Sequence, residues 1–257
     1  MAFQTFLIVV TASSCATWLA VFRLSAVVLT WLCSTYEGLS KHRRHVVDDS
    51  FKAAVYGCFA GPLAWYAYIC TEIPPEGVWL DVPLVRFLSA LYMGSILAQL
   101  IVTIGFPYAS KTDFILYKMH HAVSLYSTYI GASYPAMPYY ANVCYMMQLS
   151  NPSVYLRVIL KELGYQDSKY YMWNGVVMCV TFALCRVLVT SIATFNLVKV
   201  MVFQDAFSRL PLHVSLCYIL GALVFNSLNY YWFSLMCKRA IGHLWRNDKQ
   251  TSEPKLK

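Results

Sequence analysis

The chain has 257 residues, of which 59% are hydrophobic and only 12% are charged, with a net charge of +8. A soluble domain carries about twice this charged fraction, so a water-soluble fold is excluded. The hydrophobic residues form continuous runs of about 20, the length of a membrane-spanning helix, and they do not alternate as the strands of a membrane barrel would. We therefore expect an all-α fold, a polytopic membrane helical bundle.

Seven hydrophobic runs predict about seven transmembrane helices. They cover residues 3–22, 51–71, 86–107, 114–132, 136–156, 171–195 and 212–236. The connections are short, which favours a single membrane domain. Between the first two runs, residues 24–33 form a further apolar stretch that either extends the first helix or lies in the membrane interface. Residues 48–50 (Asp-Asp-Ser) precede the second run and are typical of a helix N-cap.

The basic residues predict the orientation of the bundle. With seven spans, sixteen Lys and Arg residues fall on the side of the C-terminal tail, whereas Arg86, Lys199 and Arg209 fall on the other side. The side richer in Lys and Arg is normally cytosolic, so we expect a cytosolic C-terminus and an N-terminus outside or in a lumen. Because these residues belong to loops and the tail, the positive charge indicates contact with lipid headgroups and no nucleic-acid partner.

Two adjacent histidines, His120 and His121, lie inside the fourth run. Ser124 and Ser127 follow His120 at helical spacing, and Ser124 and Thr128 follow His121, so the span should carry a polar stripe that faces the bundle. An ionisable group at the bilayer centre costs about 2.5–3.5 kcal/mol and therefore usually faces protein or a cavity. The imidazoles could act as base, nucleophile or hydrogen-bond donor; alternatively, they fix helix packing through interhelical hydrogen bonds.

The fifth run contains Gln148, Asn151 and Pro152, with Arg157 five residues later. Proline removes a helical hydrogen bond and frees a backbone carbonyl one turn earlier. Two outcomes are equally consistent with this pattern. The helix is either broken where it lines a cavity, or simply kinked at its cytosolic end.

The sixth run contains Asn174 and Arg186, twelve residues apart. This separation corresponds to a helix rise of about 18 Å, so the two side chains are not expected to share one small site. Arg186 lies deep in the run, and no Asp or Glu falls within a predicted span. A lipid anion, backbone carbonyls, or Gln148 and the asparagines remain as its partners. In the last run Asn226 and Asn229 share a face, and interhelical hydrogen bonding is their expected role.

The order of these motifs resembles the TLC-domain membrane proteins, whose relatives include the ceramide synthases and the translocating-chain-associating membrane protein. The segments that carry the resemblance are His120-His121, 149–157, 171–175, 182–186 and 220–232. The small TLC-domain-containing proteins are the nearest group. The resemblance implies a TLC-like membrane domain at 50–240. The apolar runs and the basic residues add a first span with a basic cytosolic loop at 1–49 and a basic cytosolic tail at 241–257. The resemblance also implies an endoplasmic-reticulum membrane and a role in lipid metabolism or sensing.

One departure from the family pattern separates the functional hypotheses. Ceramide synthases carry acidic residues on the span after the histidine pair, and small TLC proteins commonly carry a glutamate there. This chain has Gln148 and Asn151 instead, and an amide cannot take up a proton. The first hypothesis is therefore a TLC-type protein that holds lipids or acyl chains and contributes to lipid homeostasis. The expected pocket residues are His120, His121, Gln148, Asn151, Arg157, Asn174, Arg186 and Asn229.

The second hypothesis is a sphingoid-base N-acyltransferase that uses acyl-CoA, with His120 or His121 as catalytic base or acyl acceptor. A transporter is the third, and the lack of a visible internal repeat argues against it. No cofactor or metal is expected, since the chain has neither a CxxC pair nor a nucleotide-binding motif. Membrane lipids or acyl chains are the expected partners, and homo-oligomerisation is left open.

Overall fold

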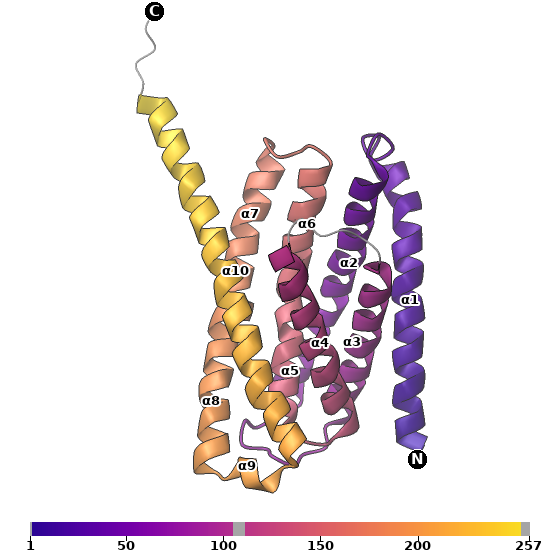
Figure 1. The fold of residues 1–257 in the computed structure, drawn as a ribbon, viewed down its shortest axis with the longest axis vertical. Coiled ribbons are helices and arrows are strands. Elements are labelled where there is room, and N and C mark those ends of the chain that lie inside the picture. The colour runs from indigo at the N-terminus through magenta and orange to yellow at the C-terminus, as the bar shows by residue number, and fades with distance from the viewer. Residues whose placement is uncertain (1, 105–110, 253–257) are drawn as a thin grey trace, which may run out of the picture.

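The protein forms a tall bundle of helices in a computed structural model that describes residues 2–104 and 111–252 (Figure 1). Helices α1, α2 and α3 form one side of the bundle, α7, α8 and α10 form the other, and α4, α5 and α6 lie between them. Helix α1 begins at one end of the bundle, and α10 ends at the opposite end. The elements are α1 (Ala2–Leu32), α2 (Lys41–Cys70), α3 (Pro83–Val102), α4 (Lys111–Ser133), α5 (Pro138–Met146), η1 (Met147–Ser150), α6 (Asn151–Glu162), α7 (Lys169–Phe182), η2 (Ala183–Leu188), α8 (Val189–Phe203), α9 (Ala206–Arg209) and α10 (Leu212–Ser252).

The helical membrane bundle is confirmed, but the number of spans differs from the expected seven. Within the described residues, five helices are long and apolar enough to cross a membrane: Phe3–Leu32, Lys41–Cys70, Pro83–Val102, Lys169–Phe203 and Leu212–Ala240. The other two expected spans correspond to α4 and to α5–η1–α6. Polar side chains lower the hydropathy of α4, and a 3-10 turn divides the other segment into short pieces.

The first two helices are longer than predicted. The stretch 24–33 extends the first helix, because α1 continues to Leu32. Helix α2 begins ten residues before the predicted start, and its N-cap is Ser40, whose hydroxyl accepts a hydrogen bond from the Arg43 amide. The prediction that residues 48–50 cap this helix is therefore wrong. It follows that Asp48 and Asp49 lie inside a membrane-length helix, contrary to the expectation that spans hold no carboxylate.

The fifth predicted span is broken where its sequence indicated. Helix α5 gives way to the 3-10 turn η1, and Pro152 stands in the first turn of α6, where its missing amide costs nothing. Two glycines of α2 allow this turn to pack closely. A Cβ on Gly61 would lie 2.6 Å from Leu149 Cα, and one on Gly57 would lie 2.7 Å from Pro152 Cδ.

The last two membrane helices also extend beyond their predicted ends. Helices α7 and α8 join through the π turn η2 into a segment from Lys169 to Phe203. Helix α10 continues to Ser252, so most of the predicted tail 241–257 is helical. Residues 253–257 of that tail, and residues 105–107 of the third predicted span, lie outside the described residues.

Polar and apolar side chains are distributed as in a membrane protein. Large apolar side chains are exposed on the outer faces of several helices, among them Ile8, Trp31, Phe59, Phe195 and Phe203. Polar side chains are buried inside, among them Ser89, Asn142, Gln148, Ser150 and Arg186. An apolar exterior is favourable against lipid, and interior polar groups must find partners within the bundle.

Candidate functional site

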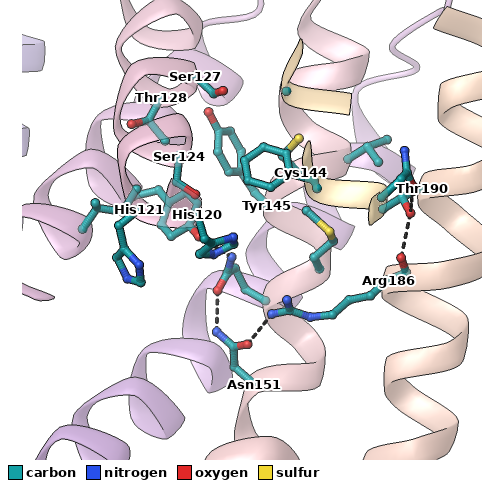
Figure 2. A pocket seen from close by; sticks show the side chains of 18 of the residues that line it. His120, His121, Ser124, Ser127, Thr128, Cys144, Tyr145, Asn151, Arg186 and Thr190 are labelled. Atoms are coloured by element: carbon teal, nitrogen blue, oxygen red, sulfur yellow. Dashed lines mark hydrogen bonds between the residues drawn. The ribbon is translucent and has the colours of Figure 1, made fainter. Parts of the chain in front are cut away.

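A cavity of about 540 Å³ lies among α2, α3, α4, α10 and the interrupted segments around η1 and η2. Its lining includes the whole polar stripe predicted for the fourth span: His120, His121, Ser124, Ser127 and Thr128. Figure 2 shows these side chains together on one side of the cavity. The prediction that this stripe faces the interior of the bundle is confirmed.

His120 is held by aromatic rings and leaves a nitrogen available. Its ring makes edge contacts with His121, Phe225 and Trp232, at centroid distances of 5.3, 5.5 and 5.7 Å. Within the described residues, the buried Nδ1 of His120 has no hydrogen-bond partner, and neither has the buried hydroxyl of Ser124. A buried polar atom without a partner carries a desolvation cost of about 1–3 kcal/mol. Both residues line the cavity, and a ligand that hydrogen-bonds to either atom would remove this cost.

His121 belongs to a different polar network. Its Nδ1 lies 2.9 Å from the carbonyl oxygen of Tyr117, and the two rings are 4.0 Å apart. The Tyr117 hydroxyl accepts a hydrogen bond from the Gln99 amide, which also donates to Asp49. Asp49 in turn pairs with the buried Lys52 at 2.7 Å. His121 is thus positioned by its own helix and linked through two side chains to a carboxylate of α2.

A chain of hydrogen bonds crosses the centre of the cavity. Arg186 donates from Nη2 to Asn151 Oδ1 at 2.6 Å and from Nε to Ser150 Oγ at 2.7 Å. Asn151 donates to Gln148 Oε1 at 2.5 Å, and Gln148 donates to the Tyr92 hydroxyl at 2.8 Å. Of the kinds of partner left open for Arg186, the structure shows one, an asparagine of the preceding span, and adds the hydroxyl of Ser150. The broken helix therefore lines a cavity, one of the two predicted outcomes.

The backbone positions Arg186 through the π turn η2, in which it stands. A π turn adds a residue to the helical repeat and often occurs at functional sites. The Arg186 carbonyl accepts a hydrogen bond from Thr190, whose hydroxyl also lies 2.8 Å from Asn226 Oδ1. These contacts, visible in part in Figure 2, connect η2 and α8 to α10 beside the cavity.

Three of the predicted pocket residues lie outside the cavity lining. Arg157 donates to the Tyr171 carbonyl at 2.9 Å, and its guanidinium carbon stands 3.8 Å from the centroid of the Tyr171 ring. Asn174 donates to the Ser153 carbonyl. Asn229 is buried and directs its amide to the sulfur of Met147. In the structure these side chains hold helices together.

The sequence model of the TLC domain matches residues 46–238. The chain belongs to the TLC-domain family. It is 28% identical to TLC domain-containing protein 4-B of Xenopus laevis over 78% of this chain and 74% of the relative. It is 22% identical to TLC domain-containing protein 4 of Homo sapiens over 84% and 83% of the two chains. No solved structure matches the chain.

The matched range includes every described residue that lines the cavity except Trp18 and Arg239. Several residues that line the cavity were not predicted from the sequence as pocket residues, among them Lys52, Tyr92 and Gln99. They come from α2 and α3, outside the stripe on α4, so only the packing of the helices brings them to the histidines. Among the described residues, no group of three His, Cys, Asp or Glu side chains could hold a metal ion.

Proposed function

We propose that this TLC-domain protein binds a lipid or acyl chain inside the bundle and contributes to membrane lipid homeostasis. The observation that carries the proposal is the mixed character of the cavity. Apolar side chains such as Ile96, Leu197 and Phe225 line it, while His120 and Ser124 offer unpartnered polar atoms. A cavity of this kind suits a molecule with an apolar chain and one polar group.

A second hollow supports entry of the ligand from the bilayer. A shallow groove runs along the outer surface between α4 and α10, lined by Leu116, Met119, Leu223, Val224, Ser227, Leu228 and Tyr231. Among the described residues Tyr231 lines both the cavity and the groove, so it lies at the boundary between the two spaces. An acyl chain that passes Tyr231 would move from lipid to the cavity without crossing water.

The lipids that co-purify with the protein test this proposal directly. We expect mass spectrometry of the extracted protein to show a lipid at near-stoichiometric amount. A Ser124→Leu variant should lose it, because the larger side chain occupies the polar centre. Ser234→Leu is the matched control, since Ser234 is exposed on α10 and bonds only within its own helix. Absence of bound lipid, together with an unchanged lipidome after deletion of the gene, would refute the proposal.

N-acyl transfer from acyl-CoA to a sphingoid base is the second candidate function. It is favoured by the histidine pair, because the unpartnered Nδ1 of His120 could accept a proton or an acyl group. Labelled acyl-CoA and sphingoid base, added to membranes that contain the protein, would give an amide product if this activity exists. The product must disappear in the His120→Ala/His121→Ala variant and exceed that of vector membranes. If membranes with the protein give no more amide product than vector membranes, N-acyl transfer is refuted and lipid binding is the function that we propose.

We also propose that the protein resides in the endoplasmic reticulum with its C-terminus in the cytosol. The location is supported by the family, and the orientation by the excess of Lys and Arg on the side of the C-terminus.

A further inference from the structure

Arg186 is a buried cation whose described partners are all uncharged. The side chain is 9% exposed, and its guanidinium contacts Ser150, Asn151 and the ring of Phe182. Within the described residues it forms no ion pair, and its Nη1 donates no hydrogen bond. A buried charge without a counterion is costly, and in membrane proteins such residues generally pair or bind a charged ligand.

The other charges near the cavity do not compensate Arg186. Lys52 and Arg239 also line the cavity, but Asp49 already neutralises Lys52, and Arg239 is an exposed residue of α10. No Asp or Glu side chain is found among the described lining residues. Across the cavity His120 faces Arg186 (Figure 2) and contributes no negative charge. The positive charge of Arg186 in the centre of the cavity is therefore left without a counterion.

We propose that the ligand of this cavity is an anionic amphiphile whose carboxylate or phosphate binds Arg186. The inference rests on the proposed lipid-binding function and specifies the headgroup. A guanidinium suits these anions because its planar fork donates parallel hydrogen bonds to two oxygens. The anion would also lie near the unpartnered atoms of His120 and Ser124, and the acyl chain would extend along the apolar lining.

The hydrogen-bond chain offers a way to neutralise Arg186 from within. Asn151→Asp would place a carboxylate on the guanidinium, since Asn151 Oδ1 is 2.6 Å from Nη2. Gln148 can accommodate the change by turning its amide, so that its NH₂ group donates to the new carboxylate and its oxygen accepts from Tyr92. The variant should therefore fold while it removes the need for an external anion.

Equilibrium binding to the purified full-length protein in lipid nanodiscs tests the inference. The probes share one chain and differ in headgroup: oleate, oleoyl lysophosphatidate and neutral oleyl alcohol. We expect at least one anionic probe to bind tenfold or more tightly than the alcohol, and the better of the two identifies carboxylate or phosphate. Asn151→Asp and Arg186→Gln should abolish this preference, because neither variant leaves an uncompensated positive charge at the site. Arg209→Gln, which removes an exposed charge, should keep the preference.

The outcomes separate this inference from the proposed function. If oleyl alcohol binds as tightly as both anionic probes, the protein binds acyl chains but the anion site is refuted. If Asn151→Asp retains the anionic preference, Arg186 is not its source. If no probe binds to folded protein, the proposed lipid-binding function itself fails.

Discussion

The buried pair of Lys52 and Asp49 shows how single side chains stabilise this interior. Lys52 Nζ lies 2.7 Å from Asp49 Oδ1 and 2.5 Å from Gln99 Oε1, and the lysine side chain is 4% exposed. Removal of one charge leaves the other buried without a counterion. We expect Asp49→Leu to lower the free energy of unfolding by about 3 kcal/mol, and the double variant Asp49→Leu/Lys52→Met to recover most of this loss.

Unfolding of the purified protein by denaturing detergent measures both effects. The control is Arg43→Gln, which breaks an ion pair with Glu162 in which Arg43 is 47% exposed. An exposed pair contributes about 1 kcal/mol or less, so this variant should change stability little. A double variant no more stable than Asp49→Leu alone would show that charge compensation is not the cause.

At the scale of elements, the close approach of α2 to η1 depends on Gly61. A methyl group there would lie 2.6 Å from both the Cα and the amide nitrogen of Leu149, and backbone atoms cannot move aside cheaply. Gly61→Ala should lower the free energy of unfolding by about 1–3 kcal/mol through overpacking. This outcome opposes the gain of about 1 kcal/mol that alanine gives over glycine in a helix. In Gly221→Ala the nearest atom would be 3.5 Å away, so the same detergent titration should show no loss.

The seam between α4 and α10 should control how fast ligand exchanges. Because Tyr231 lines both the outer groove and the cavity, Tyr231→Ala would open a path between them. We expect a fluorescent acyl probe to leave this variant several times faster than it leaves the parent protein in stopped-flow displacement. Leu220→Ala removes an exposed side chain of the same helix that lines neither space, and should leave the rate unchanged. Equal rates in all three proteins would mean that ligand enters elsewhere.

Local signals in the sequence predicted some of these elements and not others. The polar stripe of α4 and the break before Pro152 were predictable, because helical spacing and the missing proline amide act within one segment. The early start of α2 was not, since Asp49 looks like part of a helix N-cap until Gln99 of α3 donates a hydrogen bond to its carboxylate. The π turn that orients Arg186 has no local signature in Ala183–Leu188. Arg157 resembled a pocket residue, yet Tyr171, fourteen residues later, accepts its hydrogen bond.

At the scale of the whole molecule, α4 and α5–η1–α6 lie lengthwise in the bundle between the qualifying spans, although neither qualifies as a span by length and composition (Figure 1). The turn between them is tied to the loop that joins two qualifying spans. Leu80 donates a backbone hydrogen bond to Pro135 at 3.0 Å, and Met137 donates to Val78 at 2.9 Å. His120, His121, Ser124, Ser127 and Thr128 of α4 line the cavity, so much of its low hydropathy reflects the interior rather than exposure to water.

This arrangement predicts which loops lie on each side of the membrane. The loop 71–82 lies at the end of the bundle opposite to the end of α10, whereas the connection 163–168 lies at the same end as it (Figure 1). Matched epitope tags can be inserted after Glu76 and after Asp167, since both residues are exposed. Lys161 and Lys169 flank the second position, and acidic residues surround the first. The positive-inside rule then places only the second tag in the cytosol.

Antibody staining of cells permeabilised only at the plasma membrane distinguishes the two positions. We expect staining of the tag after Asp167 and of a C-terminal tag, and staining of the tag after Glu76 only once internal membranes are opened. The reverse pattern would mean that the protein has the opposite orientation in the membrane, with its positively charged loops in the lumen. Staining of all three tags before internal membranes are opened would mean that the helices between them do not cross the membrane as the bundle requires.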